Sequence, residues 1–435
     1  MIYNHVPVYN LSAVLKETGL KAELLRAWER RYNMPAPQRT SGGHRLYSDY
    51  DIAVIKWLHD RQKEGLSISS AVELWKEMTQ NGQHPLQEYS PGSQLEKDTL
   101  VESSRQIEIL RQSWIKACLA FNPLEAGGVI NRAFAIYPIE MVCTDLLQMG
   151  LREIGDLWYQ GKITVQQEHF ASNLAVRRLE TLIAASPNPN RNQTILLACP
   201  AGEWHTFPAL TLNLFLRRKG FNVVYLGANT PLDQLEQTAA AVNPSAVVLA
   251  AQQLTSAASV KAAALIFQKT NIPLAYGGLI FNRIPDLLNR LPAIFLGGTL
   301  KDALNQVDRV VSYQVTPSAT ITEDSSNISV LFHSKKTLVE SRVVEQFQNQ
   351  GLDIEHFDEV NDFLSSRLTA ALFLGDPAFV EPDLEWVKKL LEDRNISNQM
   401  APYLNAYLLA VNLVMGSDGA VISNWMSAYL NKLSG

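Results

Sequence analysis

Glu203, Trp204 and His205 lie in a loop, CPAGEWHTFP, that follows the apolar run Thr194–Ala198 and precedes a helical pattern. An imidazole at the carboxyl end of a parallel strand can bind a metal, and a carboxylate two residues earlier can hold the ring in one tautomer. Ligands of open α/β sheets bind at this edge of the strands. The loop therefore predicts a ligand site in which His205 is the metal ligand.

A second group of residues of the same kind lies upstream, where Trp158 is followed ten residues later by Glu168 and His169. Taken alone, this pattern is most simply a buried tryptophan followed by the start of a helix after Thr164. The Glu-x-His loop downstream favours the other interpretation, in which both groups face one ligand.

The composition limits the class of protein. A chain of 435 residues corresponds to about three domains of ordinary size. It has no run of 18 apolar residues, and its first residues lack a basic start and an apolar core, so we expect neither a transmembrane helix nor a signal peptide. Cys118, Cys143 and Cys199 fit no zinc spacing, and we expect buried thiols in a cytoplasmic protein.

The elements that position these residues begin with a helical part, residues 1–79. Helices are predicted from about Ser12 to Thr18, Lys21 to Tyr32, Ser48 to Glu64 and Ser67 to Thr79. An irregular stretch rich in Pro and Gly separates the second helix from the third.

Basic residues gather in this N-terminal part. The whole chain carries a net charge of −5, but residues 21–50 contain six basic and three acidic residues, enough for a local face that contacts phosphate groups. A helix over residues 24–32 can enter a major groove, and the Gly-containing loop at residues 41–48 can act as a wing on the DNA backbone. For a lone basic helix, a solvated surface helix followed by a turn is the alternative.

The order of these residues resembles the winged helix-turn-helix of the MerR family over residues 6–78. The resemblance rests on the run RAWERRY, on Pro35, and on a wing with Gly43, Arg45 and Tyr47 that opens a further helix. It implies binding to a double-stranded DNA operator. We expect Trp28 to be shared between the core and the DNA, and we expect the contacts to come from Arg26, Trp28, Arg30, Arg31, Arg39, His44, Arg45 and Tyr47.

Beyond residue 79 the pattern changes several times. Residues 80–103 are polar and broken by Pro and Gly, which is typical of a linker. Residues 104–186 have helical periodicity with turn signals and predict a four-helix bundle. Residues 193–312 alternate five apolar strands with helices and predict a doubly wound, Rossmann-like sheet of parallel strands.

Residues 327–435 predict a small α/β domain of receiver-like shape, so the expected fold class is multidomain α and α/β. The acidic pair that a receiver needs for Mg²⁺ is replaced by the letters HSKK, and phosphorylation at Asp376 is not expected. Strands are expected at Ile328–Phe332, Ile354–Phe357 and Ala370–Leu374.

A helical bundle followed by a Rossmann-like domain with these two motifs resembles the cobalamin-binding module. With the MerR-like part in front, residues 1–312 resemble the light-responsive regulators of the CarH/LitR type. The resemblance implies adenosylcobalamin as the cofactor, His205 as the lower axial ligand of its cobalt, and Glu203 as the partner of His205. It also implies further cofactor contacts from Trp158, Glu168, His169, Trp204, Gly277 and Gly278, the glycine pair letting the nucleotide tail approach the backbone.

The same resemblance implies a DNA-binding repressor that is not an enzyme and has no membrane partner. Such regulators form a homo-oligomer, here a dimer or a tetramer, and leave DNA when light breaks the cobalt–carbon bond.

Three motifs depart from the family pattern. Tyr159 follows the tryptophan where some members have a histidine, and Glu203 and Pro208 replace an aspartate and a glycine of the loop. After the third strand, the letters AAQ replace Ser-x-Leu, and the lost hydrogen-bond donor is typically worth about 1 kcal/mol. Gln252 or Gln253 can supply a substitute donor.

Two other functions fit parts of the sequence. One is a MerR-type regulator whose sensor acts without cobalamin, through another tetrapyrrole or a protein partner. The other is a corrinoid carrier in methyl transfer. The DNA-binding part argues against the carrier, as does the lack of a segment of TIM-barrel size for a substrate site.

Overall fold

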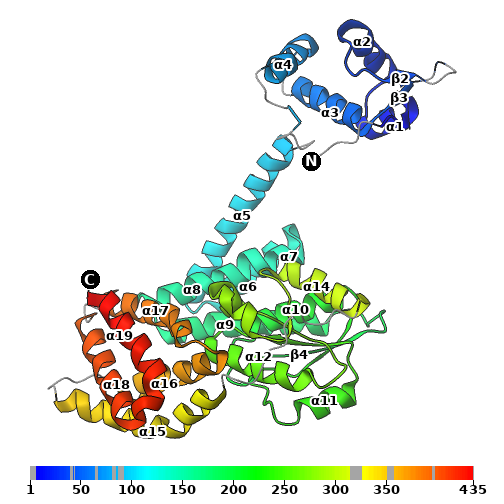
Figure 1. Ribbon diagram of the computed structural model, residues 1–435. Coiled ribbons are helices and arrows are strands. Elements are labelled where there is room, and N and C mark those ends of the chain that lie inside the picture. The colour runs from blue at the N-terminus through cyan, green and yellow to red at the C-terminus, as the bar shows by residue number, and fades with distance from the viewer. Residues whose placement is uncertain are drawn as a thin grey trace. The chain divides into compact units, whose positions relative to one another are not determined.

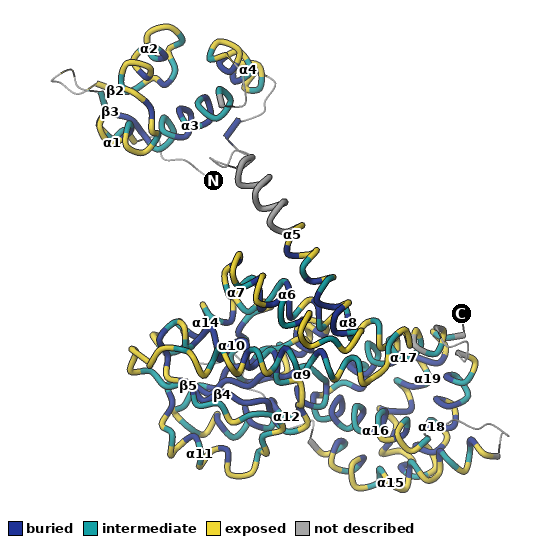
Figure 2. Tube along the Cα trace, turned by 180° about the vertical axis from the view of Figure 1, so that it is seen from behind, coloured by how far each residue is buried: buried dark blue, intermediate teal, exposed yellow. Residues whose placement is uncertain are grey.

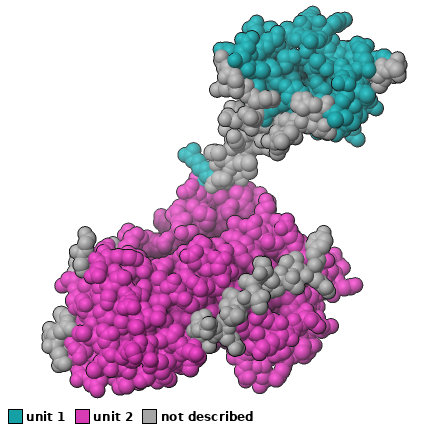
Figure 3. All heavy atoms as spheres, viewed as in Figure 1, with its two compact units in different colours: residues 1–106 teal, residues 107–435 magenta. Residues whose placement is uncertain are grey.

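Contacts between residues divide the chain into two units, residues 1–106 and residues 107–435 (Figure 3). The computed structural model describes residues 6–39, 43, 45–63, 67–80, 85–86, 93–313, 326–349, 357–393 and 397–434.

The first unit begins with two short helices whose ends are set by local signals. Helix α1 (Leu11–Thr18) is capped by Asn10, whose side chain accepts a hydrogen bond from the backbone of Ala13, so the helix begins one residue before the predicted start near Ser12. The helix ends at Gly19, which has φ +71°, a conformation that glycine adopts without strain. Helix α2 (Ala22–Tyr32) follows.

A small antiparallel sheet joins these helices to the next pair. Strands β1 (Tyr9–Asn10), β3 (Arg45–Tyr47) and β2 (Gln38–Arg39) lie in that order, and β2 with β3 forms the predicted wing (Figure 1). Helices α3 (Asp49–Lys63) and α4 (Ile68–Gln80) complete the unit. Their shared core contains Val14, Leu25, Trp28, Tyr47, Trp57 and Leu58.

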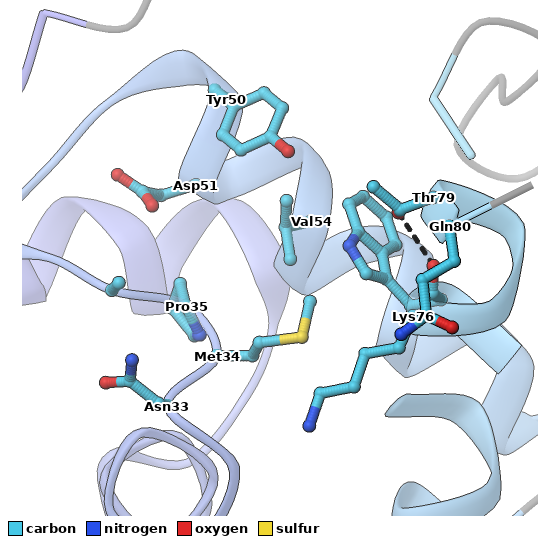
Figure 4. A pocket seen from close by; sticks show the side chains of 11 residues that line it. Asn33, Met34, Pro35, Tyr50, Asp51, Val54, Lys76, Thr79 and Gln80 are labelled. Atoms are coloured by element: carbon cyan, nitrogen blue, oxygen red, sulfur yellow. Dashed lines mark hydrogen bonds between the residues drawn. The ribbon is translucent and has the colours of Figure 1, made fainter. Parts of the chain in front are cut away.

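A cavity of about 410 Å³ opens between the end of α2 and helices α3 and α4 (Figure 4). None of the predicted DNA contacts that the structure describes lines it, so it is not part of that predicted surface. Its lining residues are Asn33, Met34, Pro35, Ala36, Tyr50, Asp51, Val54, Trp75, Lys76, Thr79 and Gln80.

The second unit contains the predicted four-helix bundle. Helix α5 (Ser93–Leu119) crosses from the first unit into the second at residue 107, and α6 (Pro123–Ile136) follows it. A continuous helical segment then runs through α7 (Ile139–Met141), the π-helical stretch η1 (Val142–Gln148) and α8 (Met149–Tyr159). Helix α9 (Val165–Ala184) is the last, and residues 93–103, expected in a linker, lie within α5.

A parallel sheet follows, with strand order β5-β4-β6-β7-β8. Apolar residues of the central strands are buried on both faces, as parallel strands require (Figure 2). The chain runs from β4 outward to β5 and then returns to β6, so the topological switch point lies between β4 and β6. The strands are β4 (Thr194–Ala198), β5 (Asn222–Tyr225), β6 (Ala246–Ala250), β7 (Leu274–Gly277) and β8 (Ile294–Phe295).

Helices cover both faces of this sheet, which confirms the doubly wound Rossmann-like prediction. Helices α10 (Phe207–Arg218) and α14 (Leu300–Tyr313) pack on one face. Helices α11 (Leu235–Val242), α12 (Leu254–Phe267) and α13 (Leu279–Arg283) pack on the other. Apolar residues of α10 also enter the core of the four-helix bundle and tie the bundle to the sheet.

The C-terminal part corrects a sequence prediction. Its described residues form helices and no sheet, so the receiver-like α/β domain is wrong. The predicted strands Ile328–Phe332 and Ala370–Leu374 lie inside helices, and of the third only Phe357 is described, at the start of α16. The helices are α15 (Ser326–Asn349), α16 (Phe357–Leu374), α17 (Glu381–Asp393), α18 (Met400–Met415) and α19 (Ala420–Ser434).

These C-terminal helices share one apolar core with the sheet domain, because α16 packs along α12. Lys261 of α12 is almost fully buried, and its Nζ donates to the backbone oxygen of Phe373 at 2.7 Å. A cation in this place favours the C-terminal end of α16 electrostatically. Burial lowers the pKa of Lys261.

The stretch Met400–Leu433 is long and apolar enough to cross a membrane by composition. In the structure a short turn at Gly416–Gly419 divides it into α18 and α19, which pack against each other. Buried residues of both helices belong to the same apolar core as α12 and α16, which accounts for their hydrophobicity.

Candidate ligand site and nucleic-acid interface

The loop after β4 is fixed by its own backbone and by the loop after β5. Gly202 has φ +80°, and its N–H donates to Asn229 Oδ1 at 2.8 Å. The backbone oxygen of Glu203 in turn accepts the N–H of Asn229 at 2.8 Å. These bonds hold the loop at the carboxyl edge of the sheet.

Glu203 is fully buried and uses both carboxylate oxygens. Oε1 accepts the Nδ1–H of His205 at 2.7 Å and the backbone N–H of His205 at 2.9 Å. Oε2 accepts the backbone N–H of Gln252 at 2.5 Å and the hydroxyl of Ser256 at 2.7 Å. Burial opposes ionisation, but these hydrogen bonds outweigh it and lower the pKa of Glu203.

His205 is thereby held through one ring nitrogen while the ring faces outward. Its side chain is 56% exposed, and Nε2 has no hydrogen-bond partner among the described residues. The bond to Glu203 raises the pKa of His205 against the opposing effect of burial. An imidazole held in this way offers one nitrogen to a metal that brings its other ligands with it.

The second predicted group lies on the bundle side of the same site. Trp158 and Tyr159 end α8, and Glu168 lies in the first turn of α9. The hydrogen bond to Glu203 is the main cause of the raised pKa of His205, and the charge of Glu168 adds a smaller contribution. Burial raises the pKa of Tyr159; the charge of Arg367 opposes this rise, and the charge of Glu168 adds to it. Glu168 thus lies close enough to His205 for its charge to act on the imidazole.

The side chains of His169 and Trp204 are more exposed to solvent than those of their neighbours in the two motifs. His169 Nδ1 is 2.8 Å from Glu168 Oε2, and most of its side chain faces solvent. Trp204 is 69% exposed, which is unusual for so large an apolar side chain. Leu279 beyond β7 is also exposed, so apolar groups project from this edge of the sheet.

The glycine pair has two different explanations. Gly278 has φ +132°, and an added Cβ would lie 1.8 Å from the backbone oxygen of Ala251, so the fold itself requires this glycine. At Gly277 an added Cβ would meet only Leu296, at an ordinary 3.8 Å. Close to Gly278, Gln252 accepts the N–H of Leu279 through Oε1, and its buried Nε2 has no partner within the described part of the chain.

The DNA-binding prediction is divided by the structure into exposed and buried residues. Arg26, Arg30 and Arg31 are exposed on α2, and Arg39 is exposed on β2. Arg39 pairs with Arg45 across the wing, which places two cations on one hairpin. His44 lies outside the described residues.

Tyr47 and Trp28 require a correction. Tyr47 is fully buried, and its hydroxyl donates to Glu29 at 2.5 Å, so it supports the wing from inside and does not face phosphate. Trp28 is also buried in the core and has no surface to offer DNA. Arg45 donates to the same Glu29 at 2.6 Å and stays partly exposed. Glu29 therefore fastens the wing to α2.

Sequence reasoning missed Ser256 as a partner of Glu203 and named Gln252 only as a substitute donor. Both follow β6, directly across the switch point from the loop after β4. The usable signal is their position, since loops on the two sides of a switch point meet at one sheet edge.

Comparison with known proteins identifies the parts. A model of the MerR HTH family regulatory protein matches residues 9–77, and models of the B12 binding domain match residues 110–183 and 193–306. HTH-type transcriptional repressor CarH of Myxococcus xanthus is 32% identical over 241 residues, which is 55% of this chain and 78% of that protein. The chain belongs to the CarH-type family of MerR transcriptional regulators. CarA, a second repressor of Myxococcus xanthus, is 32% identical over 242 residues, covering 55% of this chain and 75% of that protein.

Membership of the CarH-type family makes the chain a B12-dependent DNA-binding regulator and agrees with the expectation that it is not an enzyme. Among solved structures, the monomethylamine corrinoid protein of Methanosarcina barkeri is 18% identical and covers 46% of this chain and 96% of its own, with a TM-score of 0.39. A likeness at that level adds no argument. The matched models end at residue 306, so helices α15 to α19 lie beyond them.

Proposed function

We propose that this chain is a transcriptional repressor whose hold on its operator is controlled by adenosylcobalamin and light. The observation that carries the proposal is His205, held through Nδ1 by the buried Glu203 while Nε2 stays free of protein partners in the described part of the chain. This arrangement would let His205 hold a cobalt ion, because the carboxylate fixes both the tautomer and the orientation of the ring.

Several residues of the site fit a corrin held between bundle and sheet. His205 would hold the cobalt, and Glu203 would keep the imidazole in place. The orphaned Nε2 of Gln252 is a buried donor that a ligand at this edge would satisfy, which supports its role as the substitute for the missing serine. Trp158 and Glu168 would cover the upper face, with His169 beside Glu168. Bound adenosylcobalamin supplies a cobalt–carbon bond that light breaks.

The DNA side of the proposal rests on exposed cations. Arg26, Arg30 and Arg31 on α2 would contact the major groove, and Arg39 and Arg45 would hold the backbone at the wing. We further propose that the regulator acts in the cytoplasm as a homo-oligomer, a dimer or a tetramer. Light then acts by favouring the state with the lower affinity for DNA.

Two experiments test this function. Adenosylcobalamin added to the purified chain in the dark should give a stoichiometric complex with an absorption spectrum that green light changes, and His205→Ala should alter that spectrum. Gel retardation with operator DNA should show weaker binding after illumination. A wild-type chain that takes up no cobalamin would refute the proposal and would leave a MerR-type regulator with another trigger.

A further inference from the structure

Helix α17 reaches the end of α8, where the cofactor motif of the bundle lies (Figures 1 and 2). The ring of Trp386 on α17 meets Tyr159 edge to face, with centroids 4.5 Å apart and an interplanar angle of 80°. The ring centroids of Tyr159 and Trp158 are 4.8 Å apart, and the ring of Trp386 stacks on that of Phe363 of α16 with centroids 6.3 Å apart. An aromatic row therefore leads from Trp158 into the C-terminal helices.

A charged group fixes the same helices to the sheet domain. Asp383 of α17 is largely buried and accepts Arg283 Nη1 and Arg367 Nε, each at 2.9 Å. Arg283 ends α13, five residues beyond Gly278, and also donates to the backbone oxygen of Pro382. Arg367 lies over the ring of Phe363 at 3.5 Å. One carboxylate thus joins the sheet domain to two C-terminal helices.

We propose that α16 and α17 form a third wall of the cobalamin site and control access to the upper face of the cofactor. This inference rests on the proposed function, which places cobalamin between bundle and sheet with Trp158 above it. Trp386 acts as a positioning residue: it restrains Tyr159, and through Tyr159 it restrains Trp158. Asp383 keeps α17 in register with α13, so that the wall stays closed.

The partial exposure of the two bundle residues supports a wall that controls access. Trp158 and Tyr159 are each 37% exposed even with Trp386 in place, so neither ring is locked into a core. An aromatic pair of this geometry is favourable by an amount that corresponds to about a three- to tenfold change in an equilibrium. Removing Trp386 should therefore free Tyr159 by about that factor.

The test measures small-ligand access to bound cobalamin and does not depend on DNA release. Full-length chain is loaded with hydroxocobalamin, azide is added, and the rate of replacement of the upper ligand is followed by stopped-flow absorbance. We expect Trp386→Ala to accelerate replacement by about three- to tenfold, and Trp386→Phe to stay near wild type. Trp75→Ala is the matched control, because Trp75 makes the same kind of edge-to-face contact with Trp57 in the first unit, and its loss should leave the rate unchanged.

A second measurement covers the case in which Trp386→Ala does not fold. In the wild-type chain, hydrogen exchange of the α17 amides should slow when hydroxocobalamin binds. Equal azide rates in wild type and Trp386→Ala, or α17 exchange unaffected by cobalamin, overturn the third wall and leave cobalamin binding intact. Failure of the wild-type chain to take up hydroxocobalamin overturns the proposed function and the third wall together.

Discussion

Replacing Glu203 with glutamine tests the central arrangement of the site. The carboxylate is fully buried and accepts four hydrogen bonds at 2.5 to 2.9 Å. The amide of glutamine has one oxygen acceptor in place of two, so its –NH₂ group must face one of the two pairs of donors, either those of His205 or those of Gln252 and Ser256. Keeping the His205 pair leaves the backbone N–H of Gln252 without an acceptor, while the Ser256 hydroxyl can turn to accept. We expect a loss of about 2–4 kcal/mol in the free energy of unfolding, because an unpaired buried donor costs about 1–3 kcal/mol and a bond to a charged acceptor is lost.

The same change should weaken cobalamin binding by about 10- to 100-fold, the usual effect of losing the partner of a metal-binding histidine. Urea denaturation measures the first effect, and absorbance titration with hydroxocobalamin measures the second. Glu236→Gln, on the exposed surface of α11, is the isosteric control and should change neither. His205→Ala should alter mainly binding, because its ring is more than half exposed. The reasoning is refuted if Glu203→Gln is as stable as wild type and binds cobalamin equally well.

Three further outcomes follow from the contacts described above. Arg30→Ala should weaken operator binding and reduce the magnitude of the slope of log K against log salt by about 0.9, which fluorescence anisotropy can measure. Arg132→Ala, on the exposed face of α6, should change neither. Equal slopes in the wild type and both variants would contradict a phosphate contact by Arg30. Tyr47→Phe should cost about 1.5–3 kcal/mol in urea denaturation, because its hydroxyl donates to a charged acceptor, without changing that salt slope; a lower slope would return Tyr47 to the phosphate contacts. Lys261→Met should destabilise the chain by about 1–3 kcal/mol through the unpaired carbonyl at the end of α16, and a more stable variant would show that burying the ammonium group costs more than its hydrogen bond contributes.

The sheet was predictable because each strand has a recognisable pattern in the sequence. Runs such as Thr194–Ala198 and Ala246–Ala250 are short, apolar and bounded by residues that favour turns. The C-terminal helices were not predictable by the same rule. Ala370–Leu374 is an equally short apolar run, but it ends a helix that is covered by α12 and by its C-terminal neighbours. A helix buried on several sides has no polar stripe, and over five residues it cannot be distinguished from a buried strand.

The site was predictable only where its residues are neighbours in the sequence. Glu203 and His205 are two positions apart on one loop, so their pairing follows from the local pattern. Ser256 is 53 positions from Glu203, and only the strand order brings the two together. Nothing in the sequence places Trp386 beside Tyr159, since that contact depends on the packing of helices that the sequence assigned to another fold.

The burial of α12 has a practical consequence for anyone who dissects this protein. Its inner side meets the sheet and its outer side meets α16, so residues as polar as Lys261 are enclosed. A truncated fragment that stops at residue 312, where the resemblance to the CarH/LitR type stops, would bare this outer side to water and invite aggregation. The segment that resembles the family is therefore shorter than the segment that must fold together. Expression fragments of the sensor should retain the last five helices.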